Sequence, residues 1–140
     1  MSAARGVRRA LAYAWVFPNT LLGIVLSVPA LVSGGRAGIV DGVMEVHGGA
    51  ATFLLRRLVL LRGGASAMTV GHVVLGRDVE SLQRTRAHER VHVRQYETWG
   101  PFFLPAYLGA SVLAAARRRH YYLDNPFERA ARAAETPPSA

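Results

Sequence analysis

The first quarter of the chain is almost entirely apolar. Residues 10–35 contain no charged side chain, and Arg5, Arg8 and Arg9 come just before them. As one continuous helix, this run would be long enough to cross a hydrocarbon core of about 30 Å. Because arginines flank the run, we expect residues 1–35 to attach the chain to a membrane. The alternative is a buried helix of a soluble protein.

Two prolines, Pro18 and Pro29, interrupt this apolar run. The sequence FPNT at 17–20 indicates a break, after which Asn19 or Thr20 caps a second helix. Three membrane arrangements fit the pattern: a kinked transmembrane helix, a short membrane-inserted hairpin, or a signal peptide cleaved near LVSGG. The prediction for this segment is therefore an apolar helix or hairpin.

Shorter apolar runs of the kind that favours strands follow. Residues 36–48, RAGIVDGVMEVHG, place two such runs around Asp41-Gly42, a dipeptide preferred in tight hairpin turns because both central residues need positive φ. The apolar run at 51–64 is compatible with a strand or a helix. Residues 65–78, rich in Val, Thr and Met, predict a strand. We expect these runs to form a small antiparallel sheet.

The strand predicted at 65–78 leads directly into a helix. A strand beside an active-site helix can pair with an extended peptide through its free backbone groups. Met68 to Leu75 is then the edge expected to face a substrate. The alternative is that this strand only completes the sheet.

A long helix is the next element. Asp78 is a good N-cap, and residues 79–99 contain neither Gly nor Pro until Gly100 and Pro101 end the segment.

Two further helices are expected after it. Residues 101–116 are uncharged and apolar. Residues 124–135 begin with Asn125 as a cap and Pro126 at the first helical position. The predicted fold class is therefore α+β: an N-terminal apolar helix or hairpin, a small antiparallel sheet, the long helix and two further helices.

The composition narrows the chemistry. With 140 residues, of which 51% are apolar, the chain can bury one modest core, and without cysteine it has no thiolate ligand or nucleophile. Its net charge of +8 comes from 17 arginines and no lysine. Basic proteins often bind nucleic acid, but no finger, helix-turn-helix or aromatic-interleaved basic run occurs, so we expect no nucleic acid partner. Any metal site must consist of His, Asp and Glu.

The long helix carries the sequence RAHERVHVRQYETWG, in which His88, Glu89 and His92 follow the order H-E-x-x-H. Four residues turn through about 400°, so the two imidazoles lie one turn apart on one face and can reach the same ion. Glu89 lies about 100° further round, where its carboxylate can contact a metal-bound water. The spacing supplies two zinc ligands and a general base.

The alternative is a surface helix with two solvated histidines. The face that carries the histidines continues with Gln95, Tyr96 and Trp99, so it is not simply solvated. The arginines of this helix form a separate stripe expected to face water: Arg86, Arg90 and Arg94.

A catalytic zinc needs a third protein ligand beside an open position for water. The metzincin continuation is absent, because Gln95 and Thr98 stand where its glycine and third histidine would be. Among the downstream carboxylates, Glu97 lies on the opposite side of the helix and Glu135 lies in the terminal ETPPSA segment.

Asp124 and Glu128 remain as candidates for the third ligand. Glu128 lies three residues past the cap Asn125, where its alternative role is an ordinary capping box. Ala131 follows one turn later on the same side, and this small residue would let the last helix approach the histidine helix closely. We therefore favour Glu128 over Asp124.

H-E-x-x-H followed by a glutamate in an E-x-x-A setting on a later helix resembles the gluzincin class of zinc metallopeptidases. HERVHVRQYE is also similar to the H-E-x-x-H-x-x-Q element of small metallopeptidase-like domains found beside bacterial contractile injection systems. The resemblance covers residues 65–135 at most. The positions that match are His88, Glu89, His92, Gln95, Glu128 and Ala131. It implies a zinc-dependent peptidase with Zn²⁺ bound by His88, His92 and Glu128, and with Glu89 as the catalytic base.

The residue that would stabilise an oxyanion cannot be matched to the family. Four residues are candidates by their position in the sequence alone: His72, His120, Tyr121 and Tyr122.

The apolar segment 101–116 constrains the topology. As a helix it would be about 24 Å long. If it crossed a bilayer, His92 and Glu128 would lie on opposite sides and could not share an ion. The zinc hypothesis therefore predicts that this segment packs back under the site or inserts only shallowly into a membrane.

The sequence thus predicts an N-terminal membrane-associating segment (1–35), a minimal zincin-like domain (36–136) and a disordered tail (137–140). The expected function is hydrolysis of peptide bonds in a peptide or protein substrate at a membrane. The alternative is a membrane-anchored metal-binding or interaction protein without catalytic turnover. Two histidines and one carboxylate also suit iron.

Overall fold

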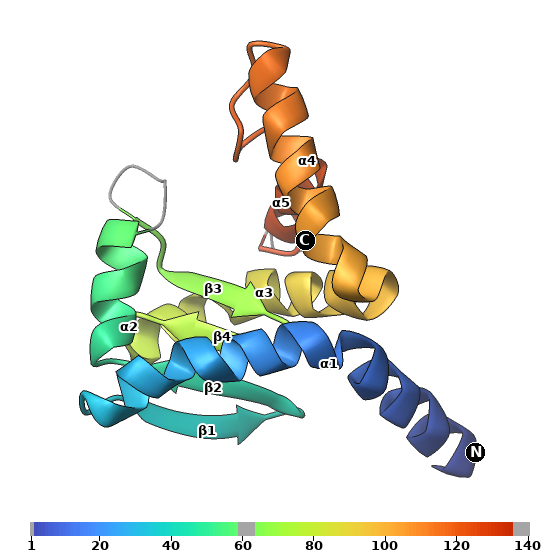
Figure 1. The fold of residues 1–140 in the computed structure, drawn as a ribbon, viewed down its shortest axis with the longest axis vertical. Coiled ribbons are helices and arrows are strands. Elements are labelled where there is room, and N and C mark those ends of the chain that lie inside the picture. The colour runs from blue at the N-terminus through green and yellow to red at the C-terminus, as the bar shows by residue number, and fades with distance from the viewer. Residues whose placement is uncertain (1, 59–63, 136–140) are drawn as a thin grey trace, which may run out of the picture.

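The computed structural model describes residues 2–58 and 64–135, and it confirms an α+β fold (Figure 1). The elements in chain order are α1 (Ser2–Val32), β1 (Arg36–Val40), β2 (Val43–His47), α2 (Ala50–Phe53) with a π-helical turn (Leu54–Leu58), β3 (Ala67–Val70), β4 (Val73–Gly76), α3 (Val79–Trp99), a 3₁₀ turn (Gly100–Phe102), α4 (Phe103–Ala116) and α5 (Pro126–Ala133). The run at 51–64 is helical as far as Leu58, and its residues 59–63 lie outside the described residues. The tail predicted at 137–140 also lies outside them.

The strands form one mixed sheet. Within the described residues the strand order is β1-β2-β4-β3, with antiparallel outer pairs and a parallel central pair, β2 and β4. The prediction of an antiparallel sheet is therefore wrong for the central pair. Each hairpin is antiparallel because its turn reverses the chain, whereas the direction in which two hairpins meet depends on contacts between segments distant in sequence.

The sequence predicted the first hairpin turn but not the second. Asp41 and Gly42 have φ of 51° and 78° and close the first hairpin as predicted. The single strand predicted at 65–78 is wrong, because the chain reverses near Gly71, where φ is 65°, and forms a second hairpin. Of the predicted edge, only Met68–Val70 lies on the edge strand β3, and Val73–Leu75 lies inside the sheet in β4.

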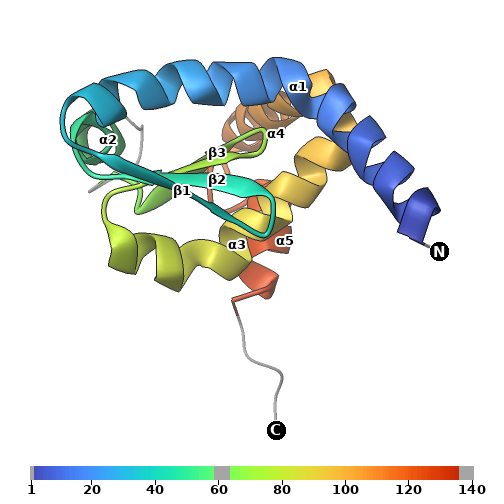
Figure 2. The ribbon, with the colours of Figure 1, turned by 90° about the horizontal axis from the view of Figure 1, so that it is seen from below.

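Helices cover both faces of the sheet. In Figure 2, α1 crosses one face and α3 crosses the other. Neighbouring residues of β4 alternate between these layers: Leu75 joins the cluster that contains Ala30 of α1, and Val74 joins the cluster that contains Leu82 and Val93 of α3. Burial on both faces explains why β4 reads as a continuous apolar run.

The break predicted at FPNT is wrong, because α1 continues through Pro18 and bends instead (Figure 1). Proline removes one backbone hydrogen bond and kinks a helix, but packing against neighbours can hold the turns on either side together. Val16, just before this proline in the chain, and Asn19, just after it, are both buried. Asn19 does not cap a helix; its Nδ2 donates to the carbonyl oxygen of Gly100 at 2.8 Å. Among the arrangements considered, the structure contains a single bent helix, and its insertion in a membrane stays a prediction.

Close packing of α1 on the sheet leads to a test. A Cβ added at Gly23 would lie 2.6 Å from the carbonyl oxygen of Val70 and 2.8 Å from Cβ of Val73, so Gly23→Ala should lower the free energy of unfolding by about 1–3 kcal/mol. At Gly6, on the same helix, an added Cβ would meet nothing within 4 Å. Gly6→Ala should therefore raise stability by about 0.5–1 kcal/mol. Urea denaturation of both variants checks this, and an unchanged or raised stability for Gly23→Ala would contradict the packing described.

The prediction that the arginine stripe of α3 faces water is wrong for two of its three members. Nη2 of Arg86 and of Arg90 lie 2.9 and 3.0 Å from the carboxylate of Glu45, a buried residue of β2. Arg90 also donates to the carbonyl oxygen of Val40 at 3.0 Å, whereas Arg94 is exposed. A buried carboxylate needs a cationic partner, and these two guanidinium groups hold α3 on the sheet.

α4 projects away from the sheet, and the chain returns beside it through residues 117–125 to α5 (Figure 1). α5 then packs on α3. The apolar segment 101–116 therefore leads out and back, so that Glu128 returns to the helix that carries the histidines.

Two helical segments of the described residues are long and apolar enough to span a membrane, judged by length and composition. They are α1 and the continuous helical run Val79–Ala116. A signal sequence or the core helix of a soluble protein would also meet this criterion.

Candidate metal centre

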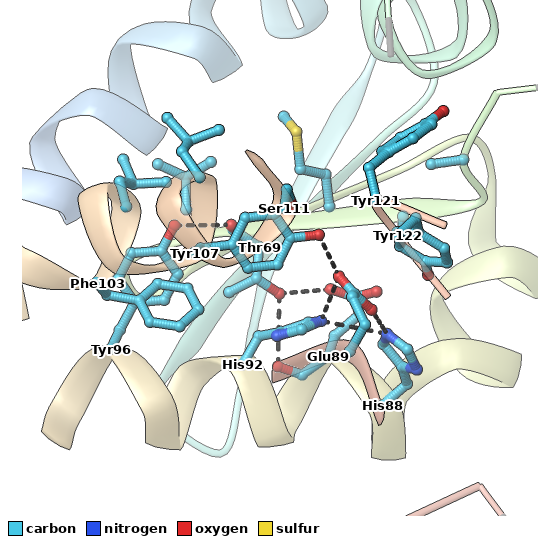
Figure 3. Close-up of a pocket in the computed structure, with 17 residues that line it drawn as sticks. Thr69, His88, Glu89, His92, Tyr96, Phe103, Tyr107, Ser111, Tyr121 and Tyr122 are labelled. Carbon is cyan, nitrogen blue, oxygen red and sulfur yellow. Dashed lines mark hydrogen bonds and ion pairs between the residues drawn. The ribbon is translucent and has the colours of Figure 1, made fainter. Parts of the chain in front are cut away.

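His88 and His92 present their Nε2 atoms to each other from successive turns of α3 (Figure 3). The two nitrogens are 3.2 Å apart, and both side chains are buried. The helix is held at its start by the carboxylate of Asp78, which accepts from the backbone N–H of Ser81 at 2.7 Å. The helix predicted from local sequence therefore places both imidazoles as the motif requires.

Glu128 of α5 completes the cluster. Its Oε2 lies 3.1 Å from Nε2 of His88, and its Oε1 lies 3.3 Å from Nε2 of His92. Asn125 caps α5 by accepting from the N–H of Phe127, and Ala131 is fully buried one turn after Glu128. The predicted residues His88, His92 and Glu128 are thus brought together.

The other carboxylates considered from the sequence take different positions. Asp124 accepts from the backbone N–H of His120 at 2.8 Å in the turn before α5. Glu97 lies 2.9 Å from Nε2 of His72. Glu135 follows α5, and its Oε1 lies 2.7 Å from Nδ1 of His88. Glu135 therefore contacts the ring nitrogen of His88 that is not the one facing Glu128.

Gln95 fixes the orientation of the His92 ring. Its Nε2 donates to the carbonyl oxygen of Phe127 at 3.1 Å, so its Oε1 must be the atom that faces Nδ1 of His92, at 2.9 Å. An amide oxygen only accepts, which places the hydrogen on Nδ1 and leaves a lone pair on Nε2 in the neutral ring. That lone pair points at the carboxylate of Glu128.

Charge in the cluster is balanced between the rings and the carboxylate. Burial alone would lower the pKa of His88 and of His92, but interactions with Glu128 and Glu89 outweigh it, so both pKa values are raised. Burial likewise favours neutral Glu128, but hydrogen bonds to His88, His92 and Tyr107 bring its pKa far below the ordinary value. Glu128 therefore stays ionised and favours a cation between itself and the rings.

The three side chains lie close enough together to share one metal ion. One donor atom from each of His88, His92 and Glu128 can be chosen such that all lie within 4.8 Å of one another. Two ligand atoms that are each about 2.0–2.1 Å from a tetrahedral zinc ion lie about 3.3 Å apart. The closest separations among the three side chains are of this size: 3.2 Å between the two Nε2 atoms, 3.1 Å from Nε2 of His88 to Oε2 of Glu128, and 3.3 Å from Nε2 of His92 to Oε1 of Glu128. Acceptor atoms this close together need protons or a metal cation between them, so the cluster could hold a metal ion.

Glu89 lies in the same cavity but outside this triad. It is buried, and its Oε2 accepts a hydrogen bond from Oγ1 of Thr69 on β3 at 2.6 Å. Burial raises the pKa of Glu89 above the ordinary value, against the opposing effect of His92 and Thr69. A carboxylate with a raised pKa can both take up and release a proton.

The cluster opens into a cavity of about 410 Å³ between β3, α3 and α4. Apolar residues form most of its wall: Met68, Val70, Phe103, Leu104 and Leu108. A second hollow of about 430 Å³ also borders His88 and Glu89 and is lined by Ser66, Thr85 and Glu135 among others. The candidate site therefore lies where an apolar and a more polar recess meet, along the edge strand β3.

The residues predicted as candidates to stabilise an oxyanion lie in different parts of the structure. His72 is wrong for this role, because it stacks on Tyr13 at 4.3 Å and contacts Glu97 away from the cavity. His120 accepts from the N–H groups of two following residues at an exposed turn and lines only the second hollow. Tyr121 and Tyr122 line the apolar cavity.

Sequence reasoning missed Tyr107. Its hydroxyl donates to Oε1 of Glu128 at 2.6 Å, and Figure 3 shows the ring reaching from α4 toward the histidines. Phe103, Tyr107 and Ser111 recur at four-residue spacing, and all three line the cavity. That spacing could have indicated one face of α4, but not which neighbour the face would meet.

The role of Gln95 can be tested. Gln95→Ala removes the acceptor that holds the Nδ1 hydrogen of His92, so metal affinity should fall by about 10–100-fold. Gln83→Ala, an exposed position on the same helix, is the control and should leave the affinity unchanged. Competition titration against a chromophoric chelator measures both variants. Equal affinities would show that Gln95 does not orient a ligand.

Comparison of the chain with protein-family models, curated proteins and solved structures gives no significant match. The resemblance to the gluzincins therefore depends on the motif residues alone.

Proposed function

We propose that the protein is a zinc-dependent peptidase in which His88, His92 and Glu128 hold Zn²⁺ and Glu89 is the general base. The observation that carries the proposal is the buried group of two imidazoles and one carboxylate, whose nearest atoms lie 3.1–3.3 Å apart and which offers one ligand atom per residue within 4.8 Å. The same cavity contains the buried carboxylate of Glu89, the residue after His88 on α3. Zinc rather than iron is proposed because it is commonly held by two histidines and a glutamate with a fourth position for water.

Bound zinc would supply Lewis acidity, which lowers the pKa of a water molecule toward neutrality and polarises a scissile carbonyl group. Glu89 would accept a proton from that water and pass it to the leaving amine. Its burial favours the proton-bearing form, and Thr69 fixes the direction of its carboxylate. Tyr121 and Tyr122, which line the same cavity, are the candidates to stabilise negative charge on the carbonyl oxygen, because Tyr107 donates its hydroxyl hydrogen to Glu128.

A peptide substrate would lie along β3. This strand is an edge of the sheet, and Ala67, Met68, Thr69 and Val70 all line the apolar cavity. Edge strands offer backbone groups that pair with an extended chain, and alternate side chains of that chain then enter pockets. A peptide bound in this way would pass directly over Glu89, which Thr69 contacts from the same strand.

We also propose that the protein is membrane-associated. The support is the length and apolar character of α1 and of the Val79–Ala116 run, together with the arginines that flank them.

Metal analysis and a peptidase assay on the intact purified chain test the proposal. We expect one equivalent of zinc and cleavage of a mixed peptide library that stops on chelation and returns when zinc is added. Bound zinc without cleavage would instead favour a metal-binding or interaction protein, which retains the ligands without turnover. Iron at one equivalent would replace the zinc assignment.

A further inference from the structure

One side of α1 is apolar and exposed along most of its length. Residues 10–35 carry no charge. Five side chains that share one face of the helix are 48–81% exposed: Phe17, Leu21, Val25, Val28 and Val32. Singly exposed apolar residues are ordinary, but a continuous row of this length marks an interaction surface.

The opposite side of α1 is bound to the protein. Asn19, Gly23 and Ser27 are buried there, and the first donates to Gly100 at the end of α3. Ser33, just beyond the helix, accepts from the backbone N–H of Ala50 at 2.7 Å. A helix that spans a bilayer alone is surrounded by lipid, whereas α1 has the sheet along one side. Only its outer side is therefore available to lipid.

α4 contributes a second exposed apolar face. Leu108, Val112 and Leu113 are 50–68% exposed, and no charged residue occurs within α4. Figure 2 shows α4 on the same side of the sheet as α1, with α3 and α5 on the other side. α4 and the part of α1 that follows its bend run roughly within the plane of Figure 1, whereas Figure 2 shows the first turns of α1 bending toward the side of α3.

Arginines stand at the outer ends of both helices. Arg5, Arg8 and Arg9 occupy the start of α1, and Arg117–Arg119 follow the end of α4. All are exposed. An apolar surface bordered by arginines complements the acyl boundary and the anionic headgroups of a bilayer.

We propose that this surface, the outer faces of α1 and α4 with their terminal arginines, binds flat on a bilayer that contains anionic lipid. α4 and the part of α1 after its bend lie along the membrane plane, and neither helix crosses the bilayer. The apolar side chains enter the headgroup and acyl boundary, and the arginines pair with lipid phosphates. Hereafter it is called the α1–α4 face.

This placement brings the candidate metal centre to the membrane surface. Leu108 belongs to the α1–α4 face and also lines the apolar cavity. If the proposed peptidase function holds, on which this step rests, the substrates are polypeptides held at the bilayer. Such a substrate would enter the cavity along α4 with its apolar side chains still shielded from water.

Flotation with lipid vesicles tests the binding. The intact chain should float with vesicles of two parts phosphatidylcholine and one part phosphatidylglycerol, and far less with phosphatidylcholine alone. The double variant Val25→Asp, Val112→Asp should bind the anionic vesicles at least about tenfold more weakly. Ile39→Asp is the matched control, because Ile39 is 71% exposed on β1, outside the α1–α4 face.

An equal loss in the control, or no binding by the unchanged chain, would overturn the proposal. A dimer in solution that Val112→Asp dissociates, without vesicle binding, would assign the α1–α4 face to a second copy of the chain. Zinc content of each variant reports whether the fold is intact, independently of lipid.

The chain has no cysteine, so single cysteines can map its orientation. Ala3→Cys, Ala37→Cys and Ala115→Cys mark exposed positions at the start of α1, on β1 beyond the other end of α1, and near the end of α4. On sealed vesicles, an impermeant maleimide should label all three. Protection of one site until detergent is added would show a crossing helix and contradict flat binding.

The substrate class has its own measurement. A lipid-tailed peptide on vesicles should be cleaved faster than the same peptide without the tail, and Val112→Asp should remove only that advantage. If neither peptide were cleaved while the chain still bound vesicles, the peptidase function would be contradicted and the proposed membrane-binding face would not. Equal cleavage of the peptides with and without the lipid tail would contradict the proposal that the substrates are held at the bilayer.

Discussion

Glu89→Gln should lower kcat for peptide hydrolysis by two to four orders of magnitude while zinc remains bound at one equivalent. The substitution removes the proton acceptor but keeps the size of the side chain and an atom that can accept from Thr69, which contacts Glu89 at 2.6 Å. Because Glu89 lies outside the triad of donor atoms, metal affinity should change little. The measurement is kcat on a library-derived peptide together with zinc content.

Glu80→Gln is the matched control for this substitution. Glu80 lies in the first turn of the same helix and is exposed, so its loss should leave kcat unchanged. If Glu89→Gln kept full activity, Glu89 would not be the base. If it lost zinc as well as activity, the defect would lie in the metal site or the fold.

Glu128→Gln should weaken zinc binding by at least about a hundredfold, because structural zinc sites derive roughly 10–16 kcal/mol from about four ligands. The carboxylate contacts both imidazoles at 3.1 and 3.3 Å, and its loss would leave two neutral rings with no anion beside the metal. Hydrolysis at low zinc should disappear with the metal. Competition titration gives the affinity, and circular dichroism checks that the helices persist.

Asp124→Asn distinguishes the two carboxylates that the sequence left as candidates. Asp124 accepts from the backbone of His120, so its substitution should leave zinc affinity within about twofold of the original, since it contacts no ligand. A large loss in Asp124→Asn with little change in Glu128→Gln would reverse the assignment of the third ligand. Similar small effects in both would mean that the site does not bind zinc through α5.

Local sequence was sufficient for the elements whose structure is decided by nearby residues. The Asp41-Gly42 turn, the Asp78 cap and the Pro126 start of α5 follow from backbone preferences within a few positions. The pairing of His88 with His92 follows from helix geometry alone. Glu128 was found because few downstream carboxylates exist and only one lay on a helix body.

Other features depended on contacts between distant segments. Pro18 predicted a break, yet packing on the sheet keeps α1 continuous. The arginines of α3 looked like a solvated stripe until β2 placed Glu45 against two of them. Tyr107 gave no signal by itself, because its role depends on where α5 returns.

The sequence alone determined that His88 and His92 of α3 would lie one turn apart on one face with the carboxylate of Glu89 beside them, since 3.6 residues complete a turn whatever the fold. Only the tertiary structure decided that α5 would return to these histidines and that β3 would be the sheet edge beside them. It also decided that Gln95 and Glu135 would face the Nδ1 atoms of His92 and His88. The physical reason is that helices and turns are set by bonds between neighbours in sequence. A metal centre needs atoms from separate segments within a few ångströms, and packing of the whole chain sets that distance.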